Sequence, residues 1–179
     1  MTKELKGTKT FENLQTAFAG ESEARNKYTF FASKAAKEGY KQISNIFSET
    51  AGNEKEHAEL WFKLFHGIGT TTENLQTAAD GEHYEHTVMY KEFAETARAE
   101  GFEDIALQME KVGSVEAEHE KRYLKLKDNI ETGKVFERDE PVKWQCSNCG
   151  FIYESKKAAS ECPACKHPQA YMQLVEENF

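Results

Sequence analysis

The first 145 residues of this 179-residue chain contain no cysteine, so disulfide bonds cannot stabilise that part of the protein. Long hydrophobic runs are also absent. None approaches the roughly 18 residues of a membrane span, and residues 1–14 lack the apolar centre of a signal peptide. Positive charge is scarce, because 23 Lys and Arg face 31 Asp and Glu and leave a formal net charge of -8. We therefore expect a cytoplasmic protein that binds neither nucleic acid nor membrane, with small molecules, metals or proteins as partners.

Helical periodicity dominates the chain up to about residue 131. Apolar residues recur at intervals of three and four in four successive segments, residues 11–35, 43–64, 75–96 and 105–130. Glycines follow three of these segments, as is typical where a helix ends in a left-handed residue. They are Gly39, Gly101 and Gly133. The pattern predicts a mainly α fold, with a four-helix bundle over residues 1–134.

The helical region repeats itself with an offset of 62 residues. EGYKQI at 38–43 matches EGFEDI at 100–105. The same offset places Glu54, His57 and Tyr28 on Glu116, His119 and Tyr90. Two related helical hairpins are the simplest explanation of this repeat.

The repeat contains a shift of one residue upstream of these positions. Matching GES at 20–22 to GEH at 81–83 requires an offset of 61 instead of 62. Symmetry alone therefore leaves open whether Glu21 or Glu23 points inward. The apolar face favours Glu21, because Phe18 and Arg25 flank it at helical spacing.

Each predicted helix carries carboxylates on its apolar face near the middle of its length. A buried, unpaired charge costs several kcal/mol or more, so clustered carboxylates need cations. A Glu from each of two helices, with Glu-x-x-His from the other two, is the recurring ligand set of carboxylate-bridged dimetal bundles. Carboxylates with imidazoles suit iron or manganese. The predicted ligands of this two-metal site are Glu21, Glu54, His57, Glu82, Glu85, Glu116 and His119.

Other polar residues lie near these ligands in the sequence. Tyr28 and Tyr90 are either ordinary core aromatics or partners whose hydroxyls bond the carboxylates, since they lie one or two turns from the ligands. His83 and His86 are expected to lie off the apolar face, in water, and His66 at a helix end. None of these three histidines is assigned to metal.

The character of the chain changes after residue 133. Two Cys-x-x-Cys pairs, CSNC and CPAC, are separated by 12 residues and surrounded by aromatic and β-branched residues. They predict a tetrahedral metal site, which so small a module needs in order to fold. The spacing leaves zinc and a single iron open and, taken alone, favours structural zinc. The predicted module covers residues 141–179, with the ligands Cys146, Cys149, Cys162 and Cys165.

The motifs FAGESEARNKY, ETAGNEKEH, GEHYEHTVMY, EAEHEKRY and CSNCGFIYE…CPAC occur in the order found in rubrerythrins, and the whole chain resembles that family. The resemblance implies a ferritin-like diiron bundle joined to a rubredoxin-like module that holds one iron rather than zinc. It implies reduction of hydrogen peroxide to water in defence against oxidative stress. Electrons would come from a rubredoxin or an NAD(P)H-linked reductase. It also implies that Glu54 and Glu116 bridge the irons, and that Glu85 distinguishes these peroxidases from oxygen-activating relatives.

The short connection between Glu54 and Glu82 predicts a homodimer. In ferritin-like bundles the second and third helices run parallel, so the chain must return along the bundle between them. Only 27 residues lie between these two ligands. At about 1.5 Å per helical residue and roughly 3.3 Å per extended one, only about 16 of them can be helical. The apolar pattern and a possible capping box from Thr70 to Glu73 suggest more, so we expect helices three and four to be swapped between subunits.

Two other functions remain open at this stage. A ferroxidase or iron-storage protein would use the same bundle, but it has little use for an attached electron-transfer module. An iron-binding protein with structural zinc in its tail would share the four cysteines.

Overall fold

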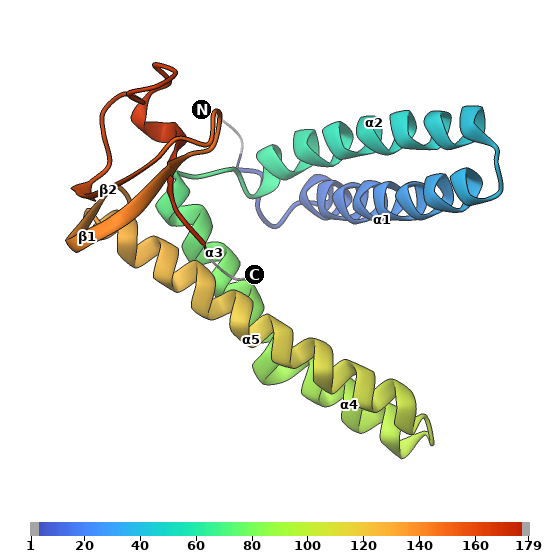
Figure 1. Ribbon diagram of the computed structural model, residues 1–179. Coiled ribbons are helices and arrows are strands. Elements are labelled where there is room, and N and C mark those ends of the chain that lie inside the picture. The colour runs from blue at the N-terminus through green and yellow to red at the C-terminus, as the bar shows by residue number, and fades with distance from the viewer. Residues whose placement is uncertain (1–3, 177–179) are drawn as a thin grey trace. The chain divides into compact units, whose positions relative to one another are not determined.

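The computed structural model describes residues 4–176, and its contacts divide the chain after Gly69 into two compact units. The first unit consists of α1 (Lys9–Lys37) and α2 (Lys41–Phe65), which run side by side (Figure 1). The hydroxyl of Thr8 caps the start of α1 by accepting a hydrogen bond from the backbone N–H of Phe11 at 3.2 Å. The turn between the helices contains Gly39, whose φ of +87° confirms a left-handed residue at the helix end.

The second unit begins with a long helical stretch that packs on α5 (Glu103–Glu131) (Figure 1). The stretch consists of α3 (Thr71–Tyr84), the π-helix η1 (Glu85–Met89) and α4 (Tyr90–Ala99). The predicted capping box at its start is confirmed, because the side chains of Thr70 and Glu73 each accept a hydrogen bond from the other's backbone N–H. The sequence pattern predicted one regular helix here and did not predict the π segment.

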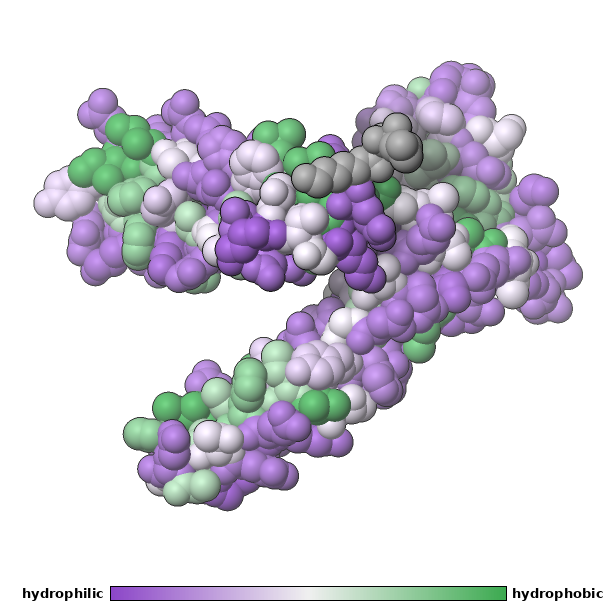
Figure 2. Space-filling model, turned by 180° about the vertical axis from the view of Figure 1, so that it is seen from behind, coloured by the Kyte–Doolittle hydropathy of each residue, from purple (hydrophilic) through white to green (hydrophobic). Residues whose placement is uncertain are grey.

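The side chains that the helices bury most completely are small. The buried apolar residues of the helices, within the part of the chain described, are all alanines. Large side chains stay exposed, among them Phe30 at 66% and Leu64 at 59% in the first unit and Phe93 at 48% in the second. Figure 2 shows such hydrophobic side chains at the surface of the helices. Each pair of helices therefore has apolar surface that it does not bury itself.

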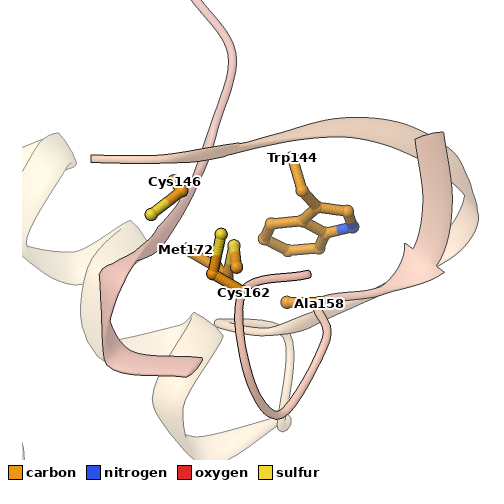
Figure 3. Packing of buried hydrophobic residues seen from close by; sticks show 5 residues of the cluster. All are labelled: Trp144, Cys146, Ala158, Cys162 and Met172. Carbon is orange, nitrogen blue, oxygen red and sulfur yellow. The ribbon is translucent and has the colours of Figure 1, made fainter. Parts of the chain in front are cut away.

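A small antiparallel sheet of order β2-β1-β3 follows α5. Its strands are β1 (Glu137–Cys146), β2 (Ile152–Lys157) and β3 (Met172–Leu174), and the 3₁₀ turn η2 (Gln169–Tyr171) precedes β3. The core of this module contains Trp144, Cys146, Ala158, Cys162 and Met172 (Figure 3). The buried indole N–H of Trp144 donates to the carbonyl of Ser155 at 2.9 Å. The predicted class, a mainly helical chain followed by a small β-rich module, is confirmed.

Within residues 4–176, no helix combines the length and the hydrophobicity that crossing a bilayer would require.

Candidate metal centres

Three of the predicted ligands meet within the first unit. α1 supplies Glu21, and α2 supplies Glu54 and His57 one helical turn apart. Nδ1 of His57 lies 2.8 Å from Oε2 of Glu54 and 3.9 Å from Oε1 of Glu21. The ligand atoms of all three lie within 4.8 Å of one another, and the Glu54 side chain is 15% exposed. We call these three residues the first half-site.

The second unit repeats this arrangement closely. Nδ1 of His119 lies 2.7 Å from Oε2 of Glu116 and 3.7 Å from Oε1 of Glu82. These three ligand atoms also lie within 4.8 Å of one another. The carboxylates are largely buried, with Glu116 14% and Glu82 19% exposed. We call this group the second half-site.

The choice between Glu21 and Glu23 is visible in the first unit. Glu21 is half-buried and faces His57, whereas Glu23 is exposed and forms an ion pair with Lys27. That ion pair lowers the pKa of Glu23, mainly through the hydrogen bond from Lys27. Glu23 thus pairs with a lysine at the surface, and Glu21 lies together with Glu54 and His57.

Glu85 and Tyr90 lie beside the second half-site. Glu85 is half-buried in η1, and its carboxylate is not part of the 4.8 Å cluster among the described residues. Burial raises the pKa of Tyr90, and the charges of Glu116, Glu85 and Glu82 raise it further. The Tyr90 hydroxyl therefore stays protonated near three carboxylates.

Tyr28, the counterpart of Tyr90 in the repeat, lies in an aromatic group of the first unit. Its ring centroid is 6.1 Å from that of Phe47 and 6.4 Å from that of Phe31. These contacts fit the interpretation of Tyr28 as a core aromatic.

The donors of the two half-sites fit divalent iron. Among the described residues, no Lys or Arg forms an ion pair with any of their four carboxylates, whose ionic partners are His57 and His119. Burial raises the pKa of Glu82, and the neighbouring Glu116 raises it further by charge and by a hydrogen bond. Such uncompensated carboxylates beside imidazoles suit a divalent transition metal. Each half-site offers three donor residues, fewer than the seven that the sequence predicts for the two-metal site.

The four cysteines lie at the distances that a tetrahedral metal site requires. Cys146 and Cys165 have their sulfurs 3.7 Å apart, and so do Cys149 and Cys162. Metal–sulfur bonds of about 2.3 Å in a tetrahedron place the sulfurs roughly 3.8 Å apart. All four thiols are free, and the sulfurs of Cys146 and Cys162 lie close together beside Trp144 (Figure 3).

The loops that carry these cysteines are built alike. In each, the residue after the second cysteine has a left-handed backbone, Gly150 with φ +78° and Lys166 with φ +63°. The backbone N–H of His167 donates to Cys165 and, together with hydrogen bonds from Cys149, Cys162 and Asn148, lowers the pKa of its thiol to about 6. The side-chain amide of Asn148 lies 3.7 Å from the same sulfur. Donors aimed at a sulfur stabilise the thiolate, which is the form that binds metal.

One group of potential ligands was missed by the sequence pattern. The expectation that His86 lies in water is wrong, because its side chain is 21% exposed and its Nε2 lies 2.6 Å from Oε2 of Glu120. His83 is 59% exposed, as expected, but its Nδ1 lies 3.0 Å from the other oxygen of Glu120. The spacing of two histidines by three residues on one helix was the available signal.

Comparisons with known proteins agree with both centres. The family model for rubrerythrin matches residues 12–127, and the one for the rubredoxin-like domain of rubrerythrin matches residues 144–173. The rubrerythrin of Porphyromonas gingivalis is 52% identical over 192 residues, covering 100% of this chain and 96% of its own length. Rubrerythrin-1 of Clostridium acetobutylicum is 52% identical over 99% of this chain and 100% of its own. The rubrerythrin of Nitratidesulfovibrio vulgaris is 45% identical, with the same shares covered.

Proposed function

The chain belongs to the rubrerythrin family of iron-containing oxidoreductases, and we propose that it reduces hydrogen peroxide to water as a defence against oxidative stress. Electrons would enter from a rubredoxin or an NAD(P)H-linked reductase and pass through the four-cysteine iron. A cytoplasmic location fits four thiols that are held for metal binding and not for disulfides.

The observation that carries this proposal is the matched pair of half-sites. Each brings two carboxylates and one imidazole together, and none of these carboxylates has a Lys or Arg partner among residues 4–176. Two irons held by both kinds of half-site would supply the two electrons that reduction of one peroxide consumes. An attached electron carrier then explains the third metal position better than iron storage does.

Two residues at the second half-site, Glu85 and Tyr90, would handle protons. Reduction of peroxide to two waters consumes two protons as well as two electrons. Tyr90 holds its proton because burial and the surrounding carboxylates raise its pKa. Glu85 lies outside the 4.8 Å cluster, close enough for its charge to act on both Tyr90 and Glu82. Glu85, itself a predicted ligand, and the protonated hydroxyl of Tyr90 would therefore lie where proton exchange is needed.

The proposal includes a homodimer in which helices are exchanged, supported by the helix ends. α2 continues eleven residues past Glu54 to Phe65, and α3 begins at Thr71, eleven residues before Glu82. If α2 and α3 run parallel with both ligands level, Phe65 and Thr71 lie about 33 Å apart. The six steps of chain between them span at most about 21 Å. Each two-metal site would then take Glu21, Glu54 and His57 from one chain and its remaining ligands from the partner.

The exposed apolar side chains also support assembly with a second chain. Leu60 is 55% exposed and Leu64 59% exposed on α2, while Ile105 is 47% and Leu126 45% exposed on α5. Helices with such faces are stable only when another pair of helices covers them. A second copy, with the same two kinds of helix pair, offers matching surfaces.

The test follows the visible absorption of the oxidised four-cysteine iron. The fully iron-loaded protein is reduced without oxygen and mixed rapidly with peroxide. We expect the absorption to recover, with peroxide consumed and no oxygen released. Glu116→Gln should slow the recovery at least about 100-fold. Glu118→Gln, a matched change on the same helix at an exposed carboxylate, should not alter it.

Absorption that stays bleached in the presence of peroxide would contradict the proposal. Uptake of many ferrous ions per chain with oxygen, and without turnover of peroxide, would instead support a ferroxidase or iron-storage protein.

A further inference from the structure

His83, His86 and Glu120 form a cluster that neither the half-sites nor the four-cysteine site uses. Nδ1 of His83 lies 3.0 Å from Oε1 of Glu120, and Nε2 of His86 lies 2.6 Å from Oε2 of the same carboxylate. The ligand atoms of all three residues lie within 4.8 Å of one another. One carboxylate thus stands between two imidazoles, with each oxygen turned toward a different ring.

The geometry suits a metal ion. The centroids of the two imidazole rings lie 5.3 Å apart, and the ring planes are at 83° to each other. Their nitrogens therefore reach the carboxylate from different directions. Ligands held at about 2.0–2.2 Å from one ion lie roughly 3 Å apart, which is close to the observed separations. Two imidazoles and one carboxylate are donors that divalent first-row transition metals prefer.

The electrostatics of the cluster also favour a cation. Among residues 4–176, the ion-pair partners of Glu120 are His83 and His86, and no Lys or Arg pairs with it. With both imidazoles neutral the cluster carries one negative charge, so a divalent ion meets attraction and no fixed positive charge. The Glu120 side chain is only 20% exposed, whereas His83 is 59% exposed and leaves a side open for entry and for water ligands.

The internal repeat shows that pairing of the helices does not require this cluster. Ala58 corresponds to Glu120 at the offset of 62, and Ser22 corresponds to His83 after the shift of one residue. In the first unit α1 and α2 still run side by side, and these two residues line a cavity of about 320 Å³. Each unit contains one half-site, whereas Glu120 and His83 have no counterpart able to bind metal in the first unit.

We propose that His83, His86 and Glu120 bind one divalent first-row transition-metal ion, with water completing its coordination. The site is mononuclear and lies within the second unit. It is separate from the two-metal and four-cysteine centres, although Glu120 follows His119 and His83 follows Glu82 in the chain. The inference does not depend on the proposed peroxidase activity.

The experiment uses full-length protein whose other centres are already loaded with iron. Zinc ions are titrated in by calorimetry, and the iron content is measured before and after. We expect one zinc ion per chain to bind without loss of iron. Zinc-edge anomalous diffraction should place it between these three side chains.

Matched variants identify the ligands. Glu120→Gln keeps the shape of the side chain and should weaken zinc binding at least about tenfold. Glu118→Gln, two residues away and paired at the surface with Lys121, should bind zinc like the unmodified protein. His83→Asn, at an exposed position, should also weaken binding, and it tests the site even if Glu120→Gln fails to fold.

Three results would overturn the inference. Zinc could fail to bind to the iron-loaded protein, it could bind equally well to the Glu120 and His83 variants, or it could bind only as iron is released.

Discussion

At the scale of single residues, the buried carboxylates of the second half-site lower the stability of the metal-free protein. Glu82 and Glu116 are largely buried. Burial raises the pKa of Glu82, and the charge of the nearby Glu116 raises it further. Because this pKa is raised, the folded protein without metal binds a proton at Glu82 more tightly than the unfolded chain does. Stability of the metal-free protein therefore falls as pH rises from the ordinary value of 4.5 through the raised pKa. Bound cations remove this penalty.

Glu82→Gln should therefore stabilise the metal-free protein at neutral pH, because the amide cannot ionise and can still hydrogen-bond to Glu116. The melting temperature should rise by about 2–4 °C for each kcal/mol gained. The advantage should vanish at acid pH, and iron binding at the two-metal site should be lost. Thermal unfolding of metal-free protein across a pH series, with iron analysis, measures both. A variant less stable than the unmodified protein at neutral pH would contradict this account.

The left-handed residues of the two cysteine loops give a second prediction at this scale. Gly150→Ala should destabilise the small module by about 1 kcal/mol, because only backbone strain opposes the added methyl group. Lys166→Gly, at the matching position, should leave stability unchanged or raise it by less than about 1 kcal/mol, since relief of strain is offset by greater freedom of the unfolded chain. Urea unfolding followed by the absorption of the four-cysteine iron measures both. Equal effects of the two changes would refute the strain argument.

At the scale of elements, the π-helix η1 explains the shift of one residue in the repeat. Glu21 and Tyr28 are seven residues apart in α1, whereas their counterparts Glu82 and Tyr90 are eight apart. The extra residue falls where Glu85–Met89 forms a π turn. A π turn absorbs an inserted residue without rotating the flanking helices out of register, and such turns are frequent at functional sites. Glu85, the first residue of this π turn, lies close enough to the second half-site for its charge to act on Glu82.

Deleting Val88, which is 37% exposed, should convert η1 into a regular α-helix with the fold retained. Ala79 and Ala94 would then be 14 residues apart, two heptads, as Phe18 and Ala32 are in α1. Because the deletion shortens the spacing between Glu85 and Tyr90 from five residues to four, it changes how these two residues lie at the second half-site, and iron at the two-metal site should fall at least about tenfold. Circular dichroism and iron analysis report the two effects separately.

The repeat supplies the control for this deletion. Removing Asn26 from the regular helix α1 breaks the 14-residue spacing of the first unit. It should therefore destabilise the protein strongly. Comparable stability of the two deletion variants would mean that the π turn does not absorb an extra residue.

At the scale of the whole molecule, the two half-sites lie in different compact units, and five residues join α2 to α3. A swapped dimer and a single-chain bundle with antiparallel α2 and α3 would both complete the ligand set. They differ in which chain supplies the ligands. Complementation between two inactive variants separates them.

Chains carrying Glu54→Ala and chains carrying Glu116→Ala should each lose iron from the two-metal site. In a swapped heterodimer of the two, one site contains both defects and the other contains none. We therefore expect purified heterodimers to recover about half of the iron and of the peroxidase activity. Differently tagged, co-expressed chains allow this measurement. No recovery in the heterodimer would show that each site is built from one chain.

The sequence by itself determined the helical segments, the helix-ending glycines, the capping box and the residue types of both metal centres. These features depend on local spacing: apolar periodicity, a glycine that tolerates positive φ, and cysteines two residues apart. Spacing also pairs Glu54 with His57 and Glu116 with His119, because residues three apart face the same side of a helix.

Only the tertiary structure decided two further points. The π turn explained the shift in the repeat, and packing of α5 against the preceding helix brought Glu120 between His83 and His86. Helical periodicity could not supply these because it treats every helix as regular and in isolation. A single π turn, or a neighbour 34 residues away, changes which side chains meet.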